Sequence, residues 1–280
     1  MEKPIVDVLM ITYNRPSYTR IALEELIARS GSLARIWVWH NGDHEETLSL
    51  VRSYSEQFHQ FHHSVDNVGL REPTNWLFNN AKGDYLSKVD DDCVVPIDWI
   101  PKLRATHEAE PRIGVLGCWR FQTEDYVEEL AKNKIVDYSG HKVLRNAWVE
   151  GSGYLMKREC FDKQGPLGRD MSFSDYCIEL ARKGWVNGWS FPFLYQEHMD
   201  DPRAENSGIR SDADLARLLP LSAKRNGVRT VEQWTAQLKR SAVIAQQAPY
   251  HPAYWSPTRR KLRNLKKRAR GLFMREKGLW

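Results

Sequence analysis

Three adjacent carboxylates, Asp90, Asp91 and Asp92, are the residues of this 280-residue sequence whose types and spacing point most directly to chemistry. Like charges this close repel one another, so the cluster is costly unless a cation or solvent relieves it. Alternate residues of an extended chain point the same way, so Asp90 and Asp92 can face one ligand while Asp91 turns elsewhere. Hard oxygen ligands suit Mg²⁺ or Mn²⁺. Because the triplet follows an apolar strand, we favour a metal site over a solvated acidic turn.

Short apolar segments alternate with helical patterns in the first part of the sequence, and one of these segments directly precedes the triplet. The expected strands span 6–12, 35–40 and 85–89, and the expected helices span 17–28, 45–54 and about 73–83. Ser17 is the expected N-cap of the first helix. Strands alternating with helices at this interval predict βαβ units, hence a mainly parallel, Rossmann-like sheet with helices on both faces. The expected fold class is α/β.

Polar residues also follow the first two predicted strands, at 12–15 and at 41–43. In a parallel sheet ligands collect at the carboxyl ends of the strands, so three strand exits offer polar groups to one rim. The first exit has no G-x-G-x-x-G pattern, and the sequence has no G-x-x-x-x-G-K-[ST]. These absences weigh against a dinucleotide oxidoreductase and a P-loop NTPase.

The composition is that of an ordinary soluble protein, with 41% apolar and 28% charged residues. Wholesale disorder is therefore excluded, and no apolar run is long enough to predict a membrane span or a signal peptide. Four scattered cysteines without a C-x-x-C pair argue against a zinc cluster and a disulfide scaffold, and predict thiols in a reducing cytoplasm.

The positive charge is confined to the end of the chain. The last 25 residues carry ten Lys or Arg and one acid, a net charge of +9, so the other 255 residues sum to −4 against the overall +5. We expect a catalytic domain at 1–211, a helical extension at 212–255 and a basic tail at 256–280. The extension has helical patterns at 212–219 and 230–247 and is expected to pack on the catalytic domain.

Residues 259–280 have the pattern of a basic amphipathic helix, with an apolar stripe at Leu262, Leu265, Ala269, Leu272 and Phe273. Such a helix lies on an anionic membrane surface. Two alternatives stay open, which are nucleic-acid binding and a solvated extension. Of the three, we prefer the membrane interpretation.

Several further motifs precede the acidic triplet: Ile11-Thr12-Tyr13-Asn14-Arg15, Asn67-Val68-Gly69-Leu70-Arg71, Asn75 and Ala81-Lys82-Gly83-Asp84-Tyr85. Together with the triplet, this series resembles the core of the family 2 glycosyltransferases of GT-A fold. The resemblance covers about residues 4–200, and the combined spacing is more specific than any single motif. It implies transfer of a sugar from a nucleotide-diphosphate donor, with Asp90 and Asp92 holding Mn²⁺ or Mg²⁺ on the diphosphate.

The resemblance also implies a set of residues that contact the donor nucleotide. They are Thr12, Tyr13, Asn14, Arg15, Asn41, Asp43, Asn67, Gly69, Arg71, Asp90 and Asp91. Tyr13 could stack on the base, and Arg71 could reach a phosphate. One departure concerns His40, which stands where the family usually has an acid, so the identity of the base stays open.

The segment from Phe173 to Trp185 resembles the family's Glu-Asp motif at the start of an acceptor-side helix. Ser174 replaces the usual Glu, but Asp175 stands at the position of the catalytic base. An inverting transfer needs a base that removes the proton of the acceptor hydroxyl. Asp175 is therefore the expected base, and the alternative is that it only caps its helix.

His198 matches, by position, a histidine that completes the metal site in many GT-A enzymes. Imidazole is a reasonable ligand for Mn²⁺ beside carboxylates. The alternatives are a surface histidine, or ligation by one of the neighbouring acids Glu197, Asp200 and Asp201.

The sequence thus predicts a metal-dependent, inverting glycosyltransferase that builds a surface polysaccharide on a glycan or lipid-linked acceptor, at the cytoplasmic face of the membrane. One alternative is a sugar-phosphate nucleotidyltransferase, but residues 12–15 are not the glycine-rich basic loop such enzymes carry. The other is a nucleic-acid-binding protein that uses the basic tail. The acidic body opposes it, and no nucleic acid is expected as a partner.

Overall fold

The computed structural model describes residues 5–256, so the expected tail at 256–280 lies outside the described residues except for Ser256. In this part of the chain nine strands form one sheet, in the order β3-β2-β1-β4-β9-β6-β10-β8-β7. The strands span Val6–Thr12 (β1), Ala34–Asn41 (β2), Gln60–Ser64 (β3), Tyr85–Asp90 (β4), Ile113–Gly117 (β6), Ile135–Tyr138 (β7), His141–Asn146 (β8), Tyr154–Lys157 (β9) and Val186–Phe191 (β10). β1, β2, β3 and β4 run parallel to one another, whereas β9 is antiparallel to both β4 and β6. The prediction of a mainly parallel α/β sheet is confirmed.

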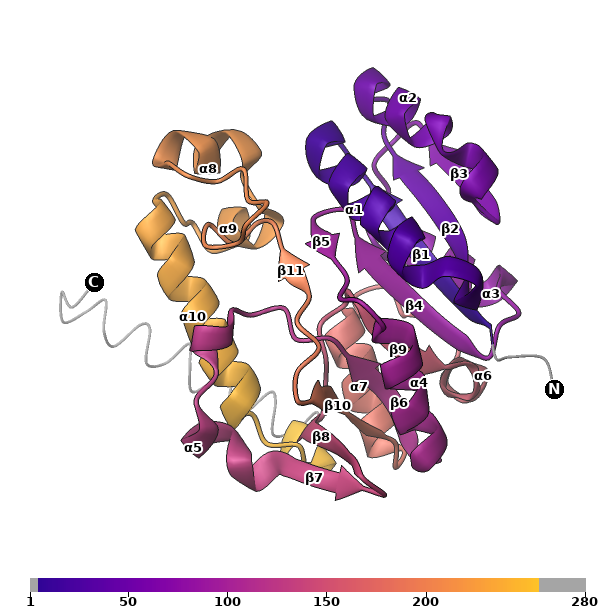
Figure 1. Ribbon diagram of the computed structural model, residues 1–280, viewed down its shortest axis with the longest axis vertical. Coiled ribbons are helices and arrows are strands. Elements are labelled where there is room, and N and C mark those ends of the chain that lie inside the picture. The colour runs from indigo at the N-terminus through magenta and orange to yellow at the C-terminus, as the bar shows by residue number, and fades with distance from the viewer. Residues whose placement is uncertain (1–4, 257–280) are drawn as a thin grey trace.

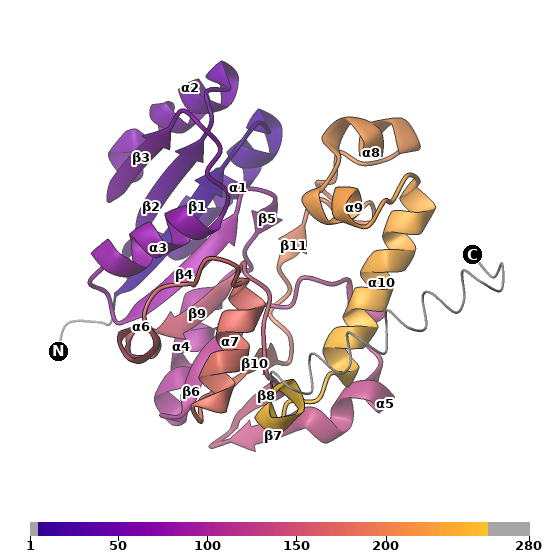
Figure 2. The same ribbon diagram turned by 180° about the vertical axis from the view of Figure 1, so that it is seen from behind.

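Helices cover both faces of this sheet, as Figures 1 and 2 show from opposite sides. They span Pro16–Ser30 (α1), Glu45–Ser53 (α2), Arg71–Asn80 (α3), Trp99–Ala109 (α4), Glu128–Ala131 (α5), Arg158–Gln164 (α6) and Phe173–Arg182 (α7). Short 3₁₀ helices span Gly31–Leu33, Ser55–Gln57, Thr123–Asp125, Lys132–Lys134 and Pro252–Trp255. α1 and α4 lie on one face, and α3 and α7 lie on the other.

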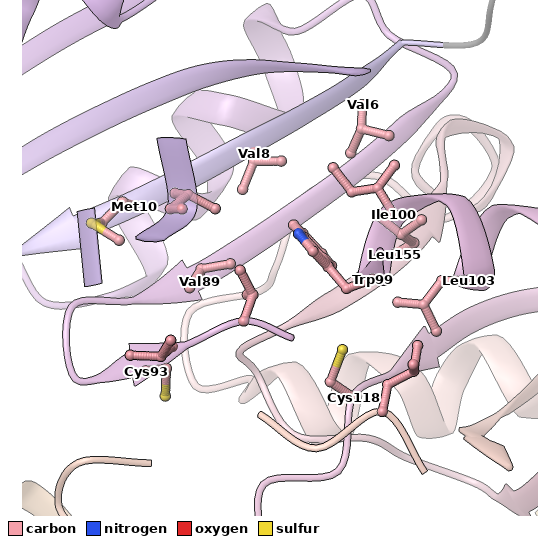
Figure 3. Packing of buried hydrophobic residues seen from close by; sticks show 14 of the residues in the cluster. Val6, Val8, Met10, Val89, Cys93, Trp99, Ile100, Leu103, Cys118 and Leu155 are labelled. Atoms are coloured by element: carbon pink, nitrogen blue, oxygen red, sulfur yellow. The ribbon is translucent and has the colours of Figure 1, made fainter. Parts of the chain in front are cut away.

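The alternation of side chains along β1 explains why both faces are covered. Val6, Val8 and Met10 pack in one buried cluster with residues of α1 and α4, and Figure 3 shows this cluster around Trp99. The residues between them, Leu9 and Ile11, pack in a second cluster with residues of α3 and α7. Because successive strand residues point to opposite faces, a strand with apolar residues on both faces is buried on both.

Two of the predicted helix ends are wrong, for local reasons. α1 begins at Pro16 rather than at Ser17, because proline already has the backbone angle of a first helical turn, and the flanking Arg15 makes no side-chain cap. α3 ends at Asn80 rather than at Gly83. A side chain on Gly83 would lie 2.5 Å from the carbonyl oxygen of Ile5, so this glycine permits a close backbone approach instead of ending a helix.

The C-terminal part of the described chain adds a helical segment beside the sheet (Figure 1). It consists of α8 (Asp212–Leu218), α9 (Leu221–Arg225) and α10 (Val231–Gln247), of which α9 was not predicted. Its own hydrophobic cluster contains Ile209, Leu215, Ala223, Trp234 and Leu238. Between this segment and the sheet, β5 (Cys93–Val94) and β11 (Glu197–His198) form a two-stranded antiparallel sheet. Among residues 5–256 no helix is both long and apolar enough to cross a bilayer.

Candidate active site

Asp90 ends β4, and Asp91 and Asp92 form the turn to β5, where pairing of β5 with β11 brings His198 close. In that pairing His198 lies opposite Cys93, and the amide of Met199 donates to the carbonyl of Asp92 at 2.8 Å. The Nε2 atom of His198 is 3.9 Å from Oδ2 of Asp92, and the Cys93 thiol donates to Oδ1 at 3.2 Å. Oxygen, sulfur and nitrogen atoms of these three side chains all lie within 4.8 Å of one another.

The protonation states of this group fit a hard divalent cation. Burial, and then the charge of Arg120, lower the pKa of His198 to about 4, so the imidazole is neutral and free to coordinate. Burial alone would raise the pKa of Asp92, but His198 and Arg15 outweigh it and hold the pKa below its ordinary value. Burial raises the pKa of the Cys93 thiol well above its ordinary value, so it keeps its proton and is a poor ligand. The group thus offers one carboxylate and one neutral imidazole to a divalent cation.

The other two carboxylates of the triplet have different partners. Asp91 turns toward the first strand exit, where it accepts hydrogen bonds from the Tyr13 amide at 2.9 Å and the Thr19 hydroxyl at 3.2 Å. Burial, and then repulsion from Asp92, raise its pKa to about 7. Asp90 accepts from the Lys88 ammonium. Asp90 is not part of the close three-atom group at Asp92, so its expected role as a metal ligand stays a prediction.

The acids near His198 are engaged by other side chains. Glu197 accepts two hydrogen bonds from Asn206, at 2.6 Å from the amide and 2.9 Å from Nδ2. Asp201 accepts from Arg203 at 2.7 Å. Asp200 accepts from Arg15 at 2.8 Å. His198 approaches both Asp92 and Cys93, whereas Asp200 shares a hydrogen bond with Asp92. The choice of His198 over the neighbouring acids therefore stays a prediction.

We call the surroundings of Asp92 and His198 the metal side of the rim, and the exits of β1 and β2 with Thr12 and Asn41 the base side. The guanidinium of Arg15 lies on the metal side. Its Nη1 atom is 3.6 Å from Asp92 and 2.8 Å from Asp200, and the side chain is only 20% exposed. Burial would lower the pKa of Arg15, but these acids and Asp91 raise it, so the guanidinium stays charged. The resemblance had assigned Arg15 to the base and ribose, and this role stays a prediction.

At the exit of β1, Thr12 is buried and bonds inward. Its hydroxyl lies 2.8 Å from Nδ1 of His40, which is also fully buried. Burial, and then the neighbouring His63, lower the pKa of His40 to about 4, so it is neutral. Tyr13, by contrast, is 43% exposed, and a side chain on Gly42 would meet its ring at 3.1 Å. Tyr13 therefore offers an accessible ring over the backbone of Gly42.

Asn41, at the end of β2, fastens the loop that carries Asn67 and Gly69. Its Nδ2 donates to the Gly69 carbonyl at 3.0 Å, and its Oδ1 accepts from Trp39 at 3.1 Å and from the Val68 amide at 3.3 Å. Asn67 accepts from the Gly69 amide at 2.9 Å, and Gly69 has a positive φ of 77° that glycine adopts without strain. Both ends of the Asn41 amide are used by the protein.

The remaining residues expected to bind the nucleotide lie at the surface. Asn14, Asp43 and Arg71 are exposed. Arg71 opens α3 and lines a cavity of about 480 Å³ together with Trp76.

Asp175 is the third residue of α7 and takes part in a capping box. Its Oδ2 accepts from the Ser172 hydroxyl at 2.8 Å, and the Ser172 hydroxyl in turn accepts from the Asp175 amide at 3.1 Å. Asp175 also lines a cavity of about 400 Å³ with Arg169 and Glu179. The helix-capping alternative is thus present in the structure, but it does not exclude a second role, because the carboxylate borders the cavity.

The sequence did not indicate how the backbone supports this site. Ser152 accepts from the Asp90 amide at 3.0 Å and from Gln196 at 3.0 Å. Gly153 has a positive φ of 65°, and a side chain there would overlap the Gln196 amide oxygen at 1.4 Å. Gly151 and Gly153, directly before β9, are the residue type that permits such a close approach.

With this fold and site in place, comparison with known proteins assigns the chain to a family. Residues 7–162 match the sequence model of glycosyl transferase family 2, and the chain belongs to that family. The glycosyltransferase GlyA of Streptococcus pneumoniae is 27% identical over 142 residues, which are 50% of this chain and 16% of GlyA. EpsH of Bacillus subtilis is 22% identical over 172 residues, 54% of this chain and 49% of EpsH. The chain therefore spans less than two thirds of these relatives.

Solved structures share the fold at low sequence identity. The mannosyltransferase PcManGT of Pyrobaculum calidifontis, in complex with GDP-Man and Mn²⁺, has a TM-score of 0.59 at 16% identity, covering 93% of this chain and 83% of its own. TarS of S. aureus, in complex with UDP-GlcNAc, has a TM-score of 0.53 at 14% identity, covering 79% and 73%. The expected GT-A fold is confirmed.

Proposed function

We propose that this protein is a metal-dependent, inverting glycosyltransferase that moves a sugar from a nucleotide-diphosphate donor to a hydroxyl group. The single observation that carries the proposal is the approach of the neutral His198 imidazole to the Asp92 carboxylate at the carboxyl edge of the parallel strands. Membership of glycosyl transferase family 2 supports sugar transfer over the nucleotidyltransferase and nucleic-acid-binding alternatives. PcManGT, of the same fold, was solved with both a nucleotide sugar and Mn²⁺.

Asp92 and His198 would hold the metal. A divalent cation bound there would neutralise the charge that develops on the departing nucleoside diphosphate. Arg15 lies 3.6 Å from Asp92 and stays charged, so it adds a fixed positive charge on the same side. Preorganised charge of this kind lowers the barrier because it needs no rearrangement during the reaction.

Asp175 would act as the base. Its carboxylate borders the cavity of about 400 Å³ at the start of α7, where an acceptor hydroxyl has room to enter. The capping box with Ser172 fixes the orientation of the side chain, and a base must be fixed to reach the hydroxyl proton. Capping and catalysis are therefore compatible uses of one carboxylate.

Tyr13, Asp43 and Arg71 would contact the nucleotide, since they are exposed at the rim. Thr12 and Asn41 would act on the nucleotide pocket indirectly, because their polar atoms bond to His40 and Gly69.

We further propose that the acceptor is a lipid-linked or glycan precursor of a surface polysaccharide, met at a membrane. The support is the basic charge of residues 256–280, a net +9 beside a body of −4. Each basic residue near an anionic surface contributes about 1 kcal/mol. Deleting the residues after Pro257 should abolish sedimentation with phosphatidylglycerol vesicles and leave nucleotide binding intact. Equal sedimentation of both forms would refute this part of the proposal.

The central experiment is calorimetric titration of the purified protein with UDP, GDP, dTDP and CDP, with and without Mn²⁺, beside an Asp92→Ala variant. Metal-dependent binding of one diphosphate, lost in the variant, is the expected result and would identify the base. If none of the four diphosphates binds under either condition, the proposed function is wrong.

A further inference from the structure

The turn from His198 to Asp201 lies between the candidate metal site and the C-terminal helices. Its backbone is closed by a hydrogen bond of 2.8 Å from the Asp201 amide to the His198 carbonyl. The Met199 carbonyl accepts from the Tyr18 hydroxyl of α1 at 2.9 Å. The Asp200 carbonyl accepts from the indole Nε1 of Trp234 in α10 at 2.6 Å. One side of the turn is thus held by the sheet domain and the other by the helical segment.

Trp234 is well suited to fix this turn. It is 1% exposed and lies in the hydrophobic cluster of the C-terminal helices with Ile209, Leu215 and Leu238. It stands in the first turns of α10, whose N-terminus is capped by the Thr230 side chain. A ring packed this tightly cannot follow a moving partner, and its buried N–H requires an acceptor. The Asp200 carbonyl supplies it.

A second contact joins the same helical segment to the site. Nη2 of Arg15 donates to the carbonyl of Leu218, the last residue of α8, at 3.4 Å. Nη1 of the same guanidinium binds the Asp200 carboxylate and faces Asp92. The helical segment therefore touches both the turn that carries His198 and the arginine beside Asp92.

We propose that Trp234 is a positioning residue for the metal site, and that α8 and α10 belong structurally to the donor side of the enzyme. By holding the Asp200 carbonyl, Trp234 fixes the turn at the distance from Asp92 that lets His198 and Asp92 bind one cation. This inference rests on the proposed function, because it presumes a metal at Asp92 and His198. It adds a residue 36 positions beyond His198 in the sequence, in a segment outside the matched family region.

The test is the affinity for Mn²⁺, measured by electron paramagnetic resonance without nucleotide, in wild type and a Trp234→Phe variant. Loss of the indole N–H should weaken Mn²⁺ binding about fivefold, the order expected for one buried hydrogen bond. The matched control is Trp99→Phe. Trp99 is fully buried in the sheet core (Figure 3), and its indole nitrogen has no hydrogen-bond partner within residues 5–256. Trp99→Phe should change the melting temperature but leave Mn²⁺ affinity within twofold of wild type.

Outcomes separate the two proposals. Unchanged Mn²⁺ affinity in Trp234→Phe, beside a wild type that binds Mn²⁺, overturns the positioning role alone. A wild type that binds Mn²⁺ neither alone nor together with any of the four nucleoside diphosphates overturns the proposed function and the positioning role with it.

If Trp234→Phe does not fold, a measurement on the intact protein decides. The ¹⁵N-indole resonance of Trp234 should shift when Mg²⁺ is added, and that of Trp99 should not. An unmoved Trp234 signal under saturating Mg²⁺ contradicts the proposal.

Discussion

Two sides of one rim use polar residues in opposite ways. On the base side, the Thr12 hydroxyl bonds to His40 and the Asn41 amide bonds to Gly69. The polar atoms of these side chains are therefore hydrogen-bonded within the protein. On the metal side, Arg15 and His198 lie beside Asp92. The first arrangement fastens a loop, whereas we propose that the second holds a cation. Substitutions on the base side should therefore alter stability, and substitutions on the metal side should alter binding and turnover.

The largest effect is expected from Asp92→Asn. The variant keeps the shape of the side chain but removes the charge that attracts the cation, so turnover should fall about 10⁴-fold, since a bound metal contributes several kcal/mol to the barrier. Mn²⁺ affinity measured by electron paramagnetic resonance should fall in parallel. Asp43→Asn, an exposed carboxylate on the base side, is the control and should bind Mn²⁺ as wild type does. Normal Mn²⁺ binding by Asp92→Asn would contradict the assignment of the metal side.

The next largest effect concerns Asp175→Asn. Loss of the base should lower the transfer rate about 10²- to 10³-fold while nucleotide binding stays unchanged. Ser172→Ala separates capping from catalysis, because it removes the cap but keeps the carboxylate. It should cost about 1 kcal/mol of stability and lower the rate less than Asp175→Asn does. Equal rate losses in the two variants would show that Asp175 only caps α7.

His198→Asn should weaken Mn²⁺ binding by about tenfold to a hundredfold, a smaller effect than that of Asp92→Asn because a neutral ligand is lost. Glu197→Gln is the neighbouring control, since its carboxylate is bound to Asn206. Isothermal titration with Mn²⁺ compares the two. A smaller loss of Mn²⁺ affinity in His198→Asn than in Glu197→Gln would favour Glu197 as the ligand.

On the base side the expected effect is on stability, through His40. Its folded-state pKa of about 4 lies below the ordinary 6.5, so the unfolded chain binds a proton more readily between these values. Stability is therefore complete above pH 6.5 and is lost as the pH falls toward 4, by about 2 kcal/mol at pH 5. In a His40→Gln variant the free energy of unfolding, measured in urea at pH 7 and pH 5, should change with pH by about 2 kcal/mol less than in wild type. The same pH dependence in both proteins would contradict this assignment.

The contrast also explains what could be predicted from sequence. Strands such as β1 and β4 were predicted correctly, because an apolar run is a local property of the chain. The edge strand β3 was not predicted, since it reads Gln-Phe-His-His-Ser and lacks an apolar pattern.

Within the site, the sequence predicted where polar side chains gather. It did not predict which of these side chains are hydrogen-bonded within the protein. Asn41 and Arg15 were placed together in one nucleotide-binding set, yet Asn41 fastens a loop and Arg15 turns to the metal side. The contact of Trp234 with Asp200 had no signal at all, because it joins segments far apart in the sequence and depends on packing. Hydrogen bonds of this kind require the folded chain.

The most direct test is to locate the metal itself. Crystals grown with Mn²⁺ and a nucleoside diphosphate should show an anomalous scattering peak at the manganese edge within coordination distance of both Asp92 and His198. A peak that contacts neither residue, or no peak while the diphosphate is bound, would contradict the metal-dependent site.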